Sequence, residues 1–258
     1  MKTFEGDFYK LLNLLKKHEP FAFNRFSDGE LFILQDKELI LAENLVQVGD
    51  KVYGHSYTKE DFKHFDPKEH GFYKDRLIES FKFDKYNYYK GICCRCCTSD
   101  KDFEWQFEIL GDKSNPNLTW ANLWVNGNYP KFINEMYPVF NEYKTVFVCN
   151  ENADLSAMPF IVKDFRVGYN AMINDYHKID EIKNWILENN IEGYLFLFSA
   201  SSFSKMAIHQ LYEACDKNTY IDVGTCLNIF MDMKQDRSYL KEYWLGEAGQ
   251  DLNKICIW

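Results

Sequence analysis

The sequence predicts a doubly wound α/β fold, in which a mostly parallel sheet carries helices on both faces. Two observations predict it. Nearly continuous apolar runs, such as residues 144–150 and 193–200, are typical of strands that are buried on both faces. Amphipathic stretches with helical spacing alternate with these runs, as they do in parallel sheets whose strands are joined by helices.

The predicted elements follow one another in a rhythm of strand and helix. The first helix, over residues 5–18, has an apolar stripe that includes Phe8, Leu11 and Leu15. Ser99, with Asp102 three residues on, predicts the start of a later helix. The other predicted helices lie near 30–36, 67–82, 129–143, 175–190 and 203–215, and the one after Ser99 covers 100–110. The predicted strands are 21–26, 88–94, 119–125, 144–150, 164–170, 193–200 and 219–225.

Length and composition predict one domain over residues 1–258, with a polar insertion around 47–66. The chain has 30 Lys and Arg against 39 Asp and Glu, and no dense basic run, so we expect no nucleic-acid partner. No apolar window approaches the length of a transmembrane helix, and the N-terminus lacks the apolar core of a signal peptide. We therefore expect a cytoplasmic protein without a transmembrane segment.

Eight cysteines are expected to stay reduced in such a compartment. Cys93, Cys94, Cys96 and Cys97 contain two overlapping C-x-x-C spacings, which suggest zinc or redox chemistry. Four ligands within five residues do not easily surround one tetrahedral ion, and no second C-x-x-C or close histidine pair is near in sequence. The favoured interpretation is therefore structural, with cysteine acting as a small apolar residue at the end of a strand.

In parallel sheets of this kind, ligands bind beyond the carboxyl ends of the strands. That rule selects four loops of the sequence, which are SDGE after 21–26, NENAD after 144–150, SASSFSK after 193–198 and GTC after 219–223. In the first loop, Asp28 and Glu30 flank a glycine. The ordinary interpretation is an Asp-Gly turn followed by a glutamate that opens the next helix.

The serine-rich loop suggests a phosphate site. Small residues between a buried strand and a helix expose backbone N–H groups at the helix N-terminus, where the helix dipole also favours an anion. Lys205, in the first turn, adds a positive charge. The alternative is that Ser201 or Ser202 is simply the N-cap of the helix. No G-x-G-x-x-G or Walker pattern supports a nicotinamide or ATP site.

Several segments together resemble one known family. FNRFSDGELFIL is similar to the RFGDGE motif of the GT-D-type glycosyltransferases, which use nucleotide-sugar donors. Residues 126–153, 164–182 and 194–225 resemble further segments of that family in the same order. The chain departs from the family pattern at Ser27, where glycine is usual, in SASS, which replaces a Gly-Pro-Thr loop, and at Thr225, which replaces a histidine.

The resemblance implies a Rossmann-like, GT-D-type fold and a metal-dependent glycosyltransferase, either a hexosyl- or a pentosyltransferase. Asp28 and Glu30 would form the DxE motif, converge on Mn²⁺ or Mg²⁺ from an extended or turning segment, and act in catalysis. Donor-binding residues implied or suggested by the loops are Asn24, Arg25, Phe26, Asn170, Ser199, Ser201, Ser202, Lys205 and Asp222. The candidates for the general base are Glu30, Glu151, Asp154 and Asp222, and the sequence does not choose among them. The expected catalytic residues are therefore Asp28, Glu30, Glu151 and Asp154.

The expected partners are a UDP-sugar donor and a glycan or glycoconjugate acceptor with a free hydroxyl, and a homo-oligomer is left open. A second hypothesis is a non-catalytic nucleotide-sugar-binding or scaffold module of a glycosylation complex, which the replacement at Thr225 favours. A third is a metal-dependent phosphohydrolase that uses the same acidic loop. Aromatic residues such as Trp120, Trp124 and Tyr129 are candidates for sugar contacts, although most aromatics are expected in the core.

Overall fold

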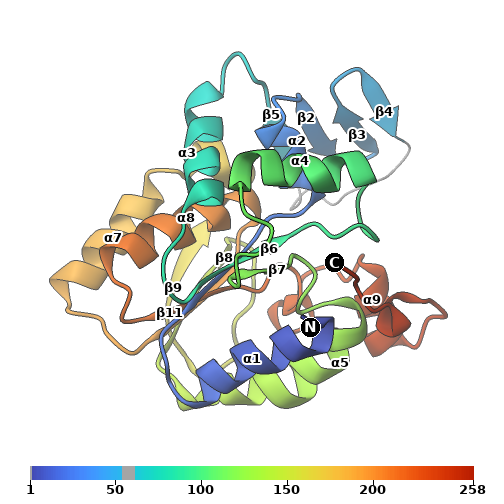
Figure 1. Cartoon of the computed structure of the whole chain (residues 1–258). Helices are drawn as coiled ribbons and strands as arrows, with labels where there is room; N and C mark the ends of the chain where they lie inside the picture. Colours follow the sequence, from blue (N-terminus) through green and yellow to red (C-terminus); the bar gives the residue numbers. More distant parts are fainter. Residues whose placement is uncertain (1, 54–61) are drawn as a thin grey trace.

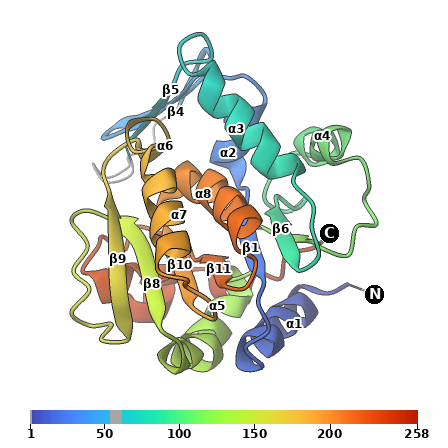
Figure 2. The same cartoon turned by 90° about the vertical axis from the view of Figure 1, so that its left-hand side faces the viewer.

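A parallel sheet is the centre of the molecule. The computed structural model describes residues 2–53 and 62–258. Within them, seven strands form one sheet in the order β7-β6-β1-β11-β10-β8-β9, with every neighbouring pair parallel (Figures 1 and 2). This confirms the predicted fold class. The strands are β1 (Ala22–Arg25), β6 (Tyr88–Ile92), β7 (Leu118–Trp120), β8 (Thr145–Asn150), β9 (Ile161–Val167), β10 (Leu195–Ser199) and β11 (Thr219–Asp222).

Helices cover both faces of this sheet. The main ones are α1 (Phe4–Lys16), α2 (Asp28–Leu34), α3 (Gly71–Lys82), α4 (Asp100–Leu110), α5 (Tyr129–Lys131), α6 (Ala171–Asn174), α7 (Lys178–Glu188), α8 (Ser201–Ala214) and α9 (Ser238–Leu240). Figure 1 shows α1 and α5 on one side of the sheet and α3, α7 and α8 on the other. No helix in the described ranges is both long and apolar enough to cross a lipid bilayer.

Side chains of the central strands alternate between two apolar cores. In β10, Phe196 and Phe198 pack with the α3, α7 and α8 side, whereas Leu195 and Leu197 pack with the α1 side. Both faces of the strand are therefore buried, which explains why its sequence is apolar without interruption. The aromatic candidates Trp120, Trp124 and Tyr129 are fully buried in the second core, so the core interpretation of these residues is confirmed.

Several predicted boundaries differ from the observed ones. The predicted strand 119–125 ends at Trp120, because a turn begins there with a hydrogen bond from the Leu123 N–H to the Trp120 carbonyl. The predicted helix 129–143 is helical but irregular: after α5, a π-helical turn (Phe132–Met136) and a 3₁₀ stretch (Tyr137–Glu142) follow. Pro138 accounts for part of this irregularity, because proline has no N–H to donate within a helix.

The polar region before residue 66 contains a second sheet that the sequence analysis missed. Its strands are antiparallel in the order β4-β3-β2-β5, namely β2 (Leu39–Ala42), β3 (Leu45–Val48), β4 (Lys51–Tyr53) and β5 (Lys63–Phe65). Two-residue turns connect the first three strands, with positive φ at Asn44 and Gly49. Such turns between apolar-rich runs are a hairpin signal. Residues 54–61 of the predicted 47–66 insertion lie outside the described residues, and the single-domain assignment stays a prediction.

Candidate functional site

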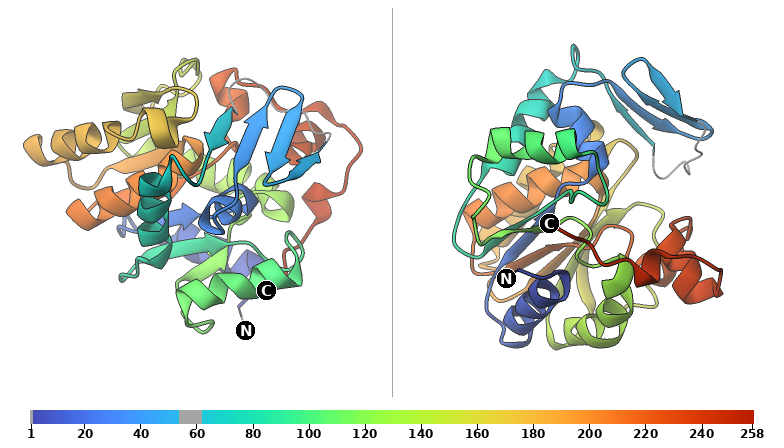
Figure 3. Two further views of the ribbon diagram at one scale, coloured as in Figure 1. Left: turned by 90° about the horizontal axis from the view of Figure 1, so that it is seen from above. Right: turned by 45° about the vertical axis from the view of Figure 1, so that its right-hand side comes forward.

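A cavity of about 740 Å³ lies at the carboxyl ends of the parallel strands. Its wall includes Arg25 at the end of β1, Asn150 at the end of β8, Ser199 at the end of β10 and Gly224 after β11. All four loops selected from the sequence therefore contribute to it. The small antiparallel sheet and the C-terminal segment, which project on the same side of the molecule in Figure 3, supply the other walls through Leu39 and Tyr239, among others.

The cavity carries more positive than negative groups, although the whole chain has a net charge of −9. The cationic lining residues among the described ones are Arg25, Lys63, Lys205, Lys234 and Arg237. The acidic lining residues there are Asp28, Glu30 and Asp251. An excess of one charge in a cleft attracts ligands of the opposite charge. The cavity is therefore suited to an anionic ligand.

Asp28 and Glu30 open helix α2, as the ordinary interpretation of the SDGE loop expected. Helical geometry turns residues i and i+2 to different sides. Asp28 is exposed at the cavity, whereas Glu30 is 3% exposed. The helix has already begun at Asp28, so the two residues do not lie in the extended or turning segment that the prediction assumed, although both line the cavity.

Glu30 is held by a dense network of partners. Its Oε2 accepts hydrogen bonds from the Ser27 N–H and hydroxyl, both at 3.1 Å, which completes a capping box at the start of α2. Its Oε1 accepts a 2.6 Å hydrogen bond from the Ser202 hydroxyl and lies 3.5 Å from the Lys63 ammonium. The Lys63 Nζ also donates to the Ser202 Oγ at 2.7 Å. The network joins α2, α8 and the small sheet.

The charge of Glu30 is strongly stabilised. Burial by itself would raise the pKa of this carboxyl group, but Lys205 and Lys63 oppose that effect, and the Ser202 hydrogen bond adds to them. The net result is a pKa lowered well below the usual range for glutamate. A carboxylate with so low a pKa is a weak proton acceptor, so Glu30 is poorly suited to be the general base.

The N-terminus of α8 faces the cavity through Ser199, Ser201 and Ser202. The N-cap is Ala200, which has no side-chain acceptor, and its N–H donates to the Ser204 Oγ at 3.1 Å, so the interpretation of Ser201 or Ser202 as N-cap is wrong. Ser201 is the first helical residue, with φ of +52°, and the Ser202 hydroxyl serves Glu30 instead. The first N–H groups of any helix have no acceptor within the helix, so this end offers donors to an anion.

Lys205 and Asp222 form a buried ion pair below the cavity floor. The Lys205 ammonium donates to the Asp222 Oδ2, and the other oxygen accepts a 2.9 Å hydrogen bond from the Gly224 N–H. Lys205 lines the cavity, whereas Asp222 does not. Asp222 thus positions a cation and a turn, and its pairing with Lys205 makes it a poor candidate for the general base.

Arg25 presents a guanidinium group for which the described part of the chain offers no hydrogen-bond partner at its buried Nε. Burial would lower the pKa of Arg25, but Asp222 and nearby groups raise it above its ordinary value, so the side chain stays charged. It lies against Gly224, where an added Cβ would be 2.1 Å from the Nη1 atom, and the φ of Gly224 is +51°. Glycine there leaves room for a cation at the cavity wall.

Two predicted donor-binding residues lie in the core instead of at the cavity. The Asn24 amide donates to the Tyr88 hydroxyl at 2.7 Å and to the Lys205 carbonyl at 2.8 Å, on the side of the sheet covered by α3 and α8. Phe26 is fully buried and packs against Phe81, with ring centroids 4.8 Å apart. The cause is the period of the strand, since alternate residues point to opposite faces and only Arg25 reaches the cavity.

Of the remaining predicted residues, Asn170 lines the cavity, whereas Glu151 and Asp154 do not. Asn170 lines the cavity in a left-handed conformation, and its amide donates to the His64 carbonyl at 2.9 Å. Glu151 is exposed, with its Oε1 3.4 Å from the Cβ position of Gly168, a lining residue. Asp154 is exposed, does not line the cavity, and accepts a 2.8 Å hydrogen bond from the Ser156 N–H. That bond lowers the pKa of Asp154.

Sequence reasoning missed Lys63 and Tyr239. Lys63 lies on β5 of the small sheet, and no motif surrounds it that would indicate a role in the cavity. Tyr239 shares a 2.7 Å hydrogen bond with Thr225, so the position of the expected histidine holds a hydroxyl pair without a group that titrates near neutral pH. Both residues come from segments whose structure the sequence analysis did not predict.

Comparisons with known proteins identify the fold of the chain. No family model matches it, and no curated protein matches it either. Its α/β architecture is similar to two solved structures. One is a selenomethionine structure of domain of unknown function 1792, with a TM-score of 0.55, 13% identity, and coverage of 93% of this chain and 80% of that one. The other is described as a new glycosyltransferase of the same domain type from Streptococcus sanguinis, with a TM-score of 0.52, 14% identity, and coverage of 94% and 85%. At such low identity the likeness establishes the fold alone.

Proposed function

We propose that the protein is a glycosyltransferase that moves a sugar from a UDP-sugar to a hydroxyl group of a glycan or glycoconjugate. The observation that carries this proposal is the cationic cavity at the carboxyl ends of the strands. Its fold is shared with a structure described as a glycosyltransferase. The sequence resemblance through the SDGE loop points to the same activity.

The diphosphate of the donor would bind between Arg25, Lys205 and the N-terminus of α8. Arg25 brings a buried Nε that has no hydrogen-bond partner among the described residues, and the helix end brings backbone donors and a favourable dipole. Lys63 adds charge from the facing sheet. These groups would also stabilise the negative charge that develops on the leaving diphosphate, since charge stabilisation in a preformed site is a large term in catalysis.

A divalent cation fits Asp28 better than Glu30. The Asp28 carboxylate is exposed at the cavity and accepts a hydrogen bond from the N–H of its neighbour Gly29 at 3.0 Å. Both oxygens of Glu30 are engaged, and an ammonium group already lies 3.5 Å from one of them. Mg²⁺ commonly binds one or two carboxylates together with substrate phosphates. We therefore assign Mn²⁺ or Mg²⁺ to Asp28 and the donor phosphates, with Glu30 as a positioning residue.

When bound, such an ion would neutralise charge on the diphosphate. Among the four predicted bases, Glu151 fits the acceptor side best. Glu30 and Asp222 are held in ion pairs. Neither Glu151 nor Asp154 lines the cavity, but the exposed Glu151 carboxylate lies 3.4 Å from the Cβ position of Gly168, a residue of the cavity wall. The proposed role of Glu151 is to take the proton of the acceptor hydroxyl as it attacks the sugar.

The second candidate function, a non-catalytic nucleotide-sugar-binding module, is favoured by Thr225. Its hydroxyl pairs with Tyr239, so this position supplies no histidine. A third candidate function for the same cavity is a metal-dependent phosphohydrolase that uses Asp28. The three functions predict different products from the same donor: glycosylated acceptor, no turnover, or hydrolysis that does not depend on an acceptor.

The test is a thermal-shift screen of uridine and guanosine diphosphate sugars with Mn²⁺, followed by turnover with and without an acceptor. A donor at 100 times its dissociation constant should stabilise the fold by about 2.7 kcal/mol. Chelation with EDTA should abolish turnover, and Mn²⁺ should restore it. A flat screen would refute the donor assignment, and full activity after chelation would refute the metal role.

A further inference from the structure

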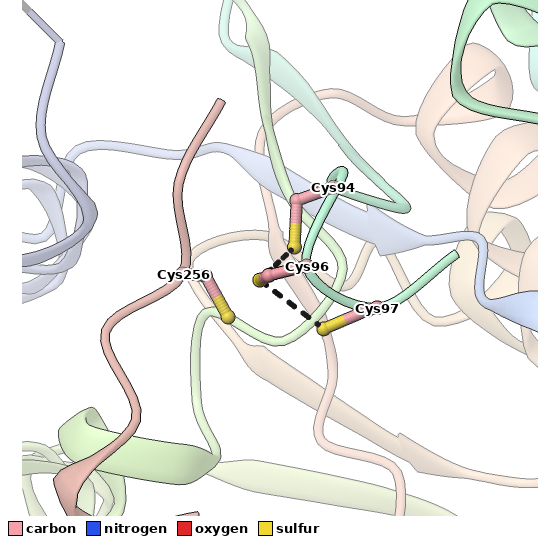
Figure 4. Close-up of side chains that lie close together, drawn as sticks. All are labelled: Cys94, Cys96, Cys97 and Cys256. Carbon is pink, nitrogen blue, oxygen red and sulfur yellow. Dashed lines mark hydrogen bonds between the residues drawn. The ribbon is translucent and has the colours of Figure 1, made fainter. Parts of the chain in front are cut away.

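Four cysteine sulfurs from distant parts of the chain meet beside the sheet (Figure 4). Cys94, Cys96 and Cys97 lie in the loop after β6, and Cys256 lies in the C-terminal tail. All four Sγ atoms are within 4.8 Å of one another. The sequence argument against a zinc site was that four ligands within five residues do not easily surround one tetrahedral ion and that no further ligand pair is near in sequence. Cys256, which is distant in sequence, provides the further ligand. Cys93 is not part of the group, because its Sγ points to the Phe26 carbonyl at 3.7 Å.

The sulfur separations fit a single bound ion. Zinc–sulfur bonds of about 2.3 Å in a tetrahedron place the sulfurs about 3.8 Å apart. The Cys94 and Cys96 sulfurs are 3.1 Å apart and those of Cys96 and Cys97 are 3.6 Å apart, with all others within 4.8 Å. A disulfide needs about 2.05 Å. All eight cysteines lie in the described ranges and have free thiols.

The local backbone brings the loop sulfurs together. The Cys97 N–H donates to the Cys94 carbonyl at 3.0 Å, and the Thr98 N–H donates to the same carbonyl at 3.1 Å. This tight turn gives the C-x-x-C pair of residues 94 and 97 the spacing used in structural zinc sites. Cys94 and Cys256 are buried, whereas Cys96 and Cys97 are half-buried, so one side of the group is open to an entering ion.

Side-chain amides complete the surroundings. The Asn122 Nδ2 donates to the Cys97 Sγ at 3.1 Å, and the Asn126 Nδ2 approaches the Cys256 Sγ at 3.5 Å. Donors aimed at sulfur favour the thiolate, which is the form that binds metals. Groups around the ligands of a metal site commonly fix their orientation in this way. Both asparagines follow β7, so a third segment of the chain supports the group.

We propose that Cys94, Cys96, Cys97 and Cys256 bind one Zn²⁺ ion in a structural tetrathiolate site. Thiolate ligands select zinc over Mg²⁺ and Mn²⁺, so this site is chemically separate from the one assigned to Asp28. The ion would tie the C-terminal tail to the loop after β6. The tail is already anchored by the Gly127 N–H, which donates to the Lys254 carbonyl at 3.0 Å, and by Trp258, which packs on Trp120 with ring centroids 5.3 Å apart.

The proposed zinc site lies close to the main cavity. A small hollow of about 120 Å³ is lined by Asp28 and Asn122 together with Cys94 and Cys97. Asn122 also lines the main cavity. Zinc bound by the cysteines would therefore fix the loop and the tail that support the wall near Asp28. The proposal does not depend on the nature of the reaction in the main cavity.

The first test is the metal content of the full chain, purified without a metal-binding tag from cells grown with zinc. Mass spectrometry of the elements should find about one zinc per chain. Cys256→Ser should retain far less, with affinity for zinc at least about 100-fold lower, because a ligand matters more than the groups around it. Cys215→Ser is the matched control, since Cys215 is half-buried, has a free thiol and lies outside the group. Equal zinc in both variants would overturn the proposal.

A second test needs no variant that might fail to fold. Zinc-free wild-type chain titrated with Co²⁺ should develop the visible bands of tetrahedral cobalt and the near-ultraviolet thiolate charge-transfer band, and one equivalent of Zn²⁺ should remove them. Alkylation of the zinc-loaded chain should spare the four cysteines together, and removal of the ion should expose them together. An absence of cobalt bands, or a disulfide among the four in mass spectra of the native chain, would overturn the proposal.

Discussion

The acidic loop after β1 and the cysteine loop after β6 lie on neighbouring strands, yet they assemble their side chains in opposite ways. Asp28 and Glu30 are two residues apart in sequence, and their carboxylates face different surroundings, one exposed and one buried. Cys97 and Cys256 come from distant segments, and their sulfurs lie within 4.8 Å. Residues that are close in sequence bring their side chains together only when the backbone conformation between them points both side chains to the same side.

The difference has a simple geometric cause. In an extended chain, residues i and i+2 point to the same side, but helical geometry separates them. Because α2 begins at Asp28, Glu30 is buried against Lys63 and Ser202, while Asp28 is exposed at the cavity that both residues line. The two acidic residues are therefore expected to do different work, one on the ligand and one on the fold. Four experiments test this division of roles and the cavity around it.

The largest effect is expected from Asp28→Asn. The change keeps the shape of the side chain and removes the charge that would hold the cation, so donor turnover should fall by about 100-fold or more, while the melting temperature stays within error. Asp100→Asn is the matched control, since Asp100 is also an exposed aspartate at the start of a helix, in this case α4. Unchanged turnover in Asp28→Asn would mean that Asp28 has no role in the reaction and only a local structural one.

Glu30→Gln should act first on stability. The variant leaves the Lys63 ammonium without its buried partner, and breaking such a pair costs about 3 kcal/mol. The double variant Glu30→Gln with Lys63→Met should recover much of that loss, because no buried charge is then left alone. Unfolding by urea measures both. If Glu30→Gln were as stable as the wild type, the division of work between the two acidic residues would be wrong.

Arg25→Met should weaken binding of UDP by about 10-fold or more, because charge-assisted hydrogen bonds to phosphate are lost. Calorimetry measures the affinity directly. The control is Arg76→Met, since Arg76 is half-buried on α3 and does not line the cavity. Equal affinity of the two variants for UDP would mean that Arg25 does not bind the diphosphate.

The smallest expected effect is a pH dependence that belongs to Glu30. Its pKa is lowered in the folded state, so its contribution to stability is fully present above the ordinary glutamate value of 4.5 and is lost as pH falls below that value toward the folded pKa. Melting temperatures of the wild type should therefore fall over this acid range more than those of Glu30→Gln. Parallel curves for the two proteins would contradict the assigned network.

The fold was predictable from the sequence to the extent that the parallel strands are buried on both faces. Uninterrupted apolar runs such as 195–198 identified the sheet, and the rule on carboxyl ends located the cavity loops. The small sheet was missed because the whole region up to residue 66 was read as polar, although β2 and β3 are short apolar-rich runs joined by a two-residue turn. Asn24 and Phe26 were predicted to bind the donor because all residues of the motif were treated alike. In a strand, however, alternate residues point to opposite faces, so these two side chains point away from the cavity.

The cysteine group was beyond prediction for a different reason. Its fourth sulfur depends on where the tail packs, and that is decided by contacts such as Trp258 on Trp120, which no local pattern encodes. Lys63 was missed in the same way, since its partner Glu30 lies across an interface between a helix and a separate sheet. The roles of Cys256 and Lys63 thus depend on partners that are distant in the sequence.

The strand order also bears on how the chain folds as it is synthesised. Strands β1, β6 and β7 are neighbours in the sheet and come from the first half of the chain, while β8, β9, β10 and β11 form the other part. The two parts meet only where β1 pairs with β11, with Ala22 opposite Tyr220. Pairing across so long a separation is slow, so each part can form before the seam closes. Arg25 and Gly224 lie on the two sides of that seam, so we expect the cavity between them to form only when the seam closes, after both parts of the sheet have been synthesised.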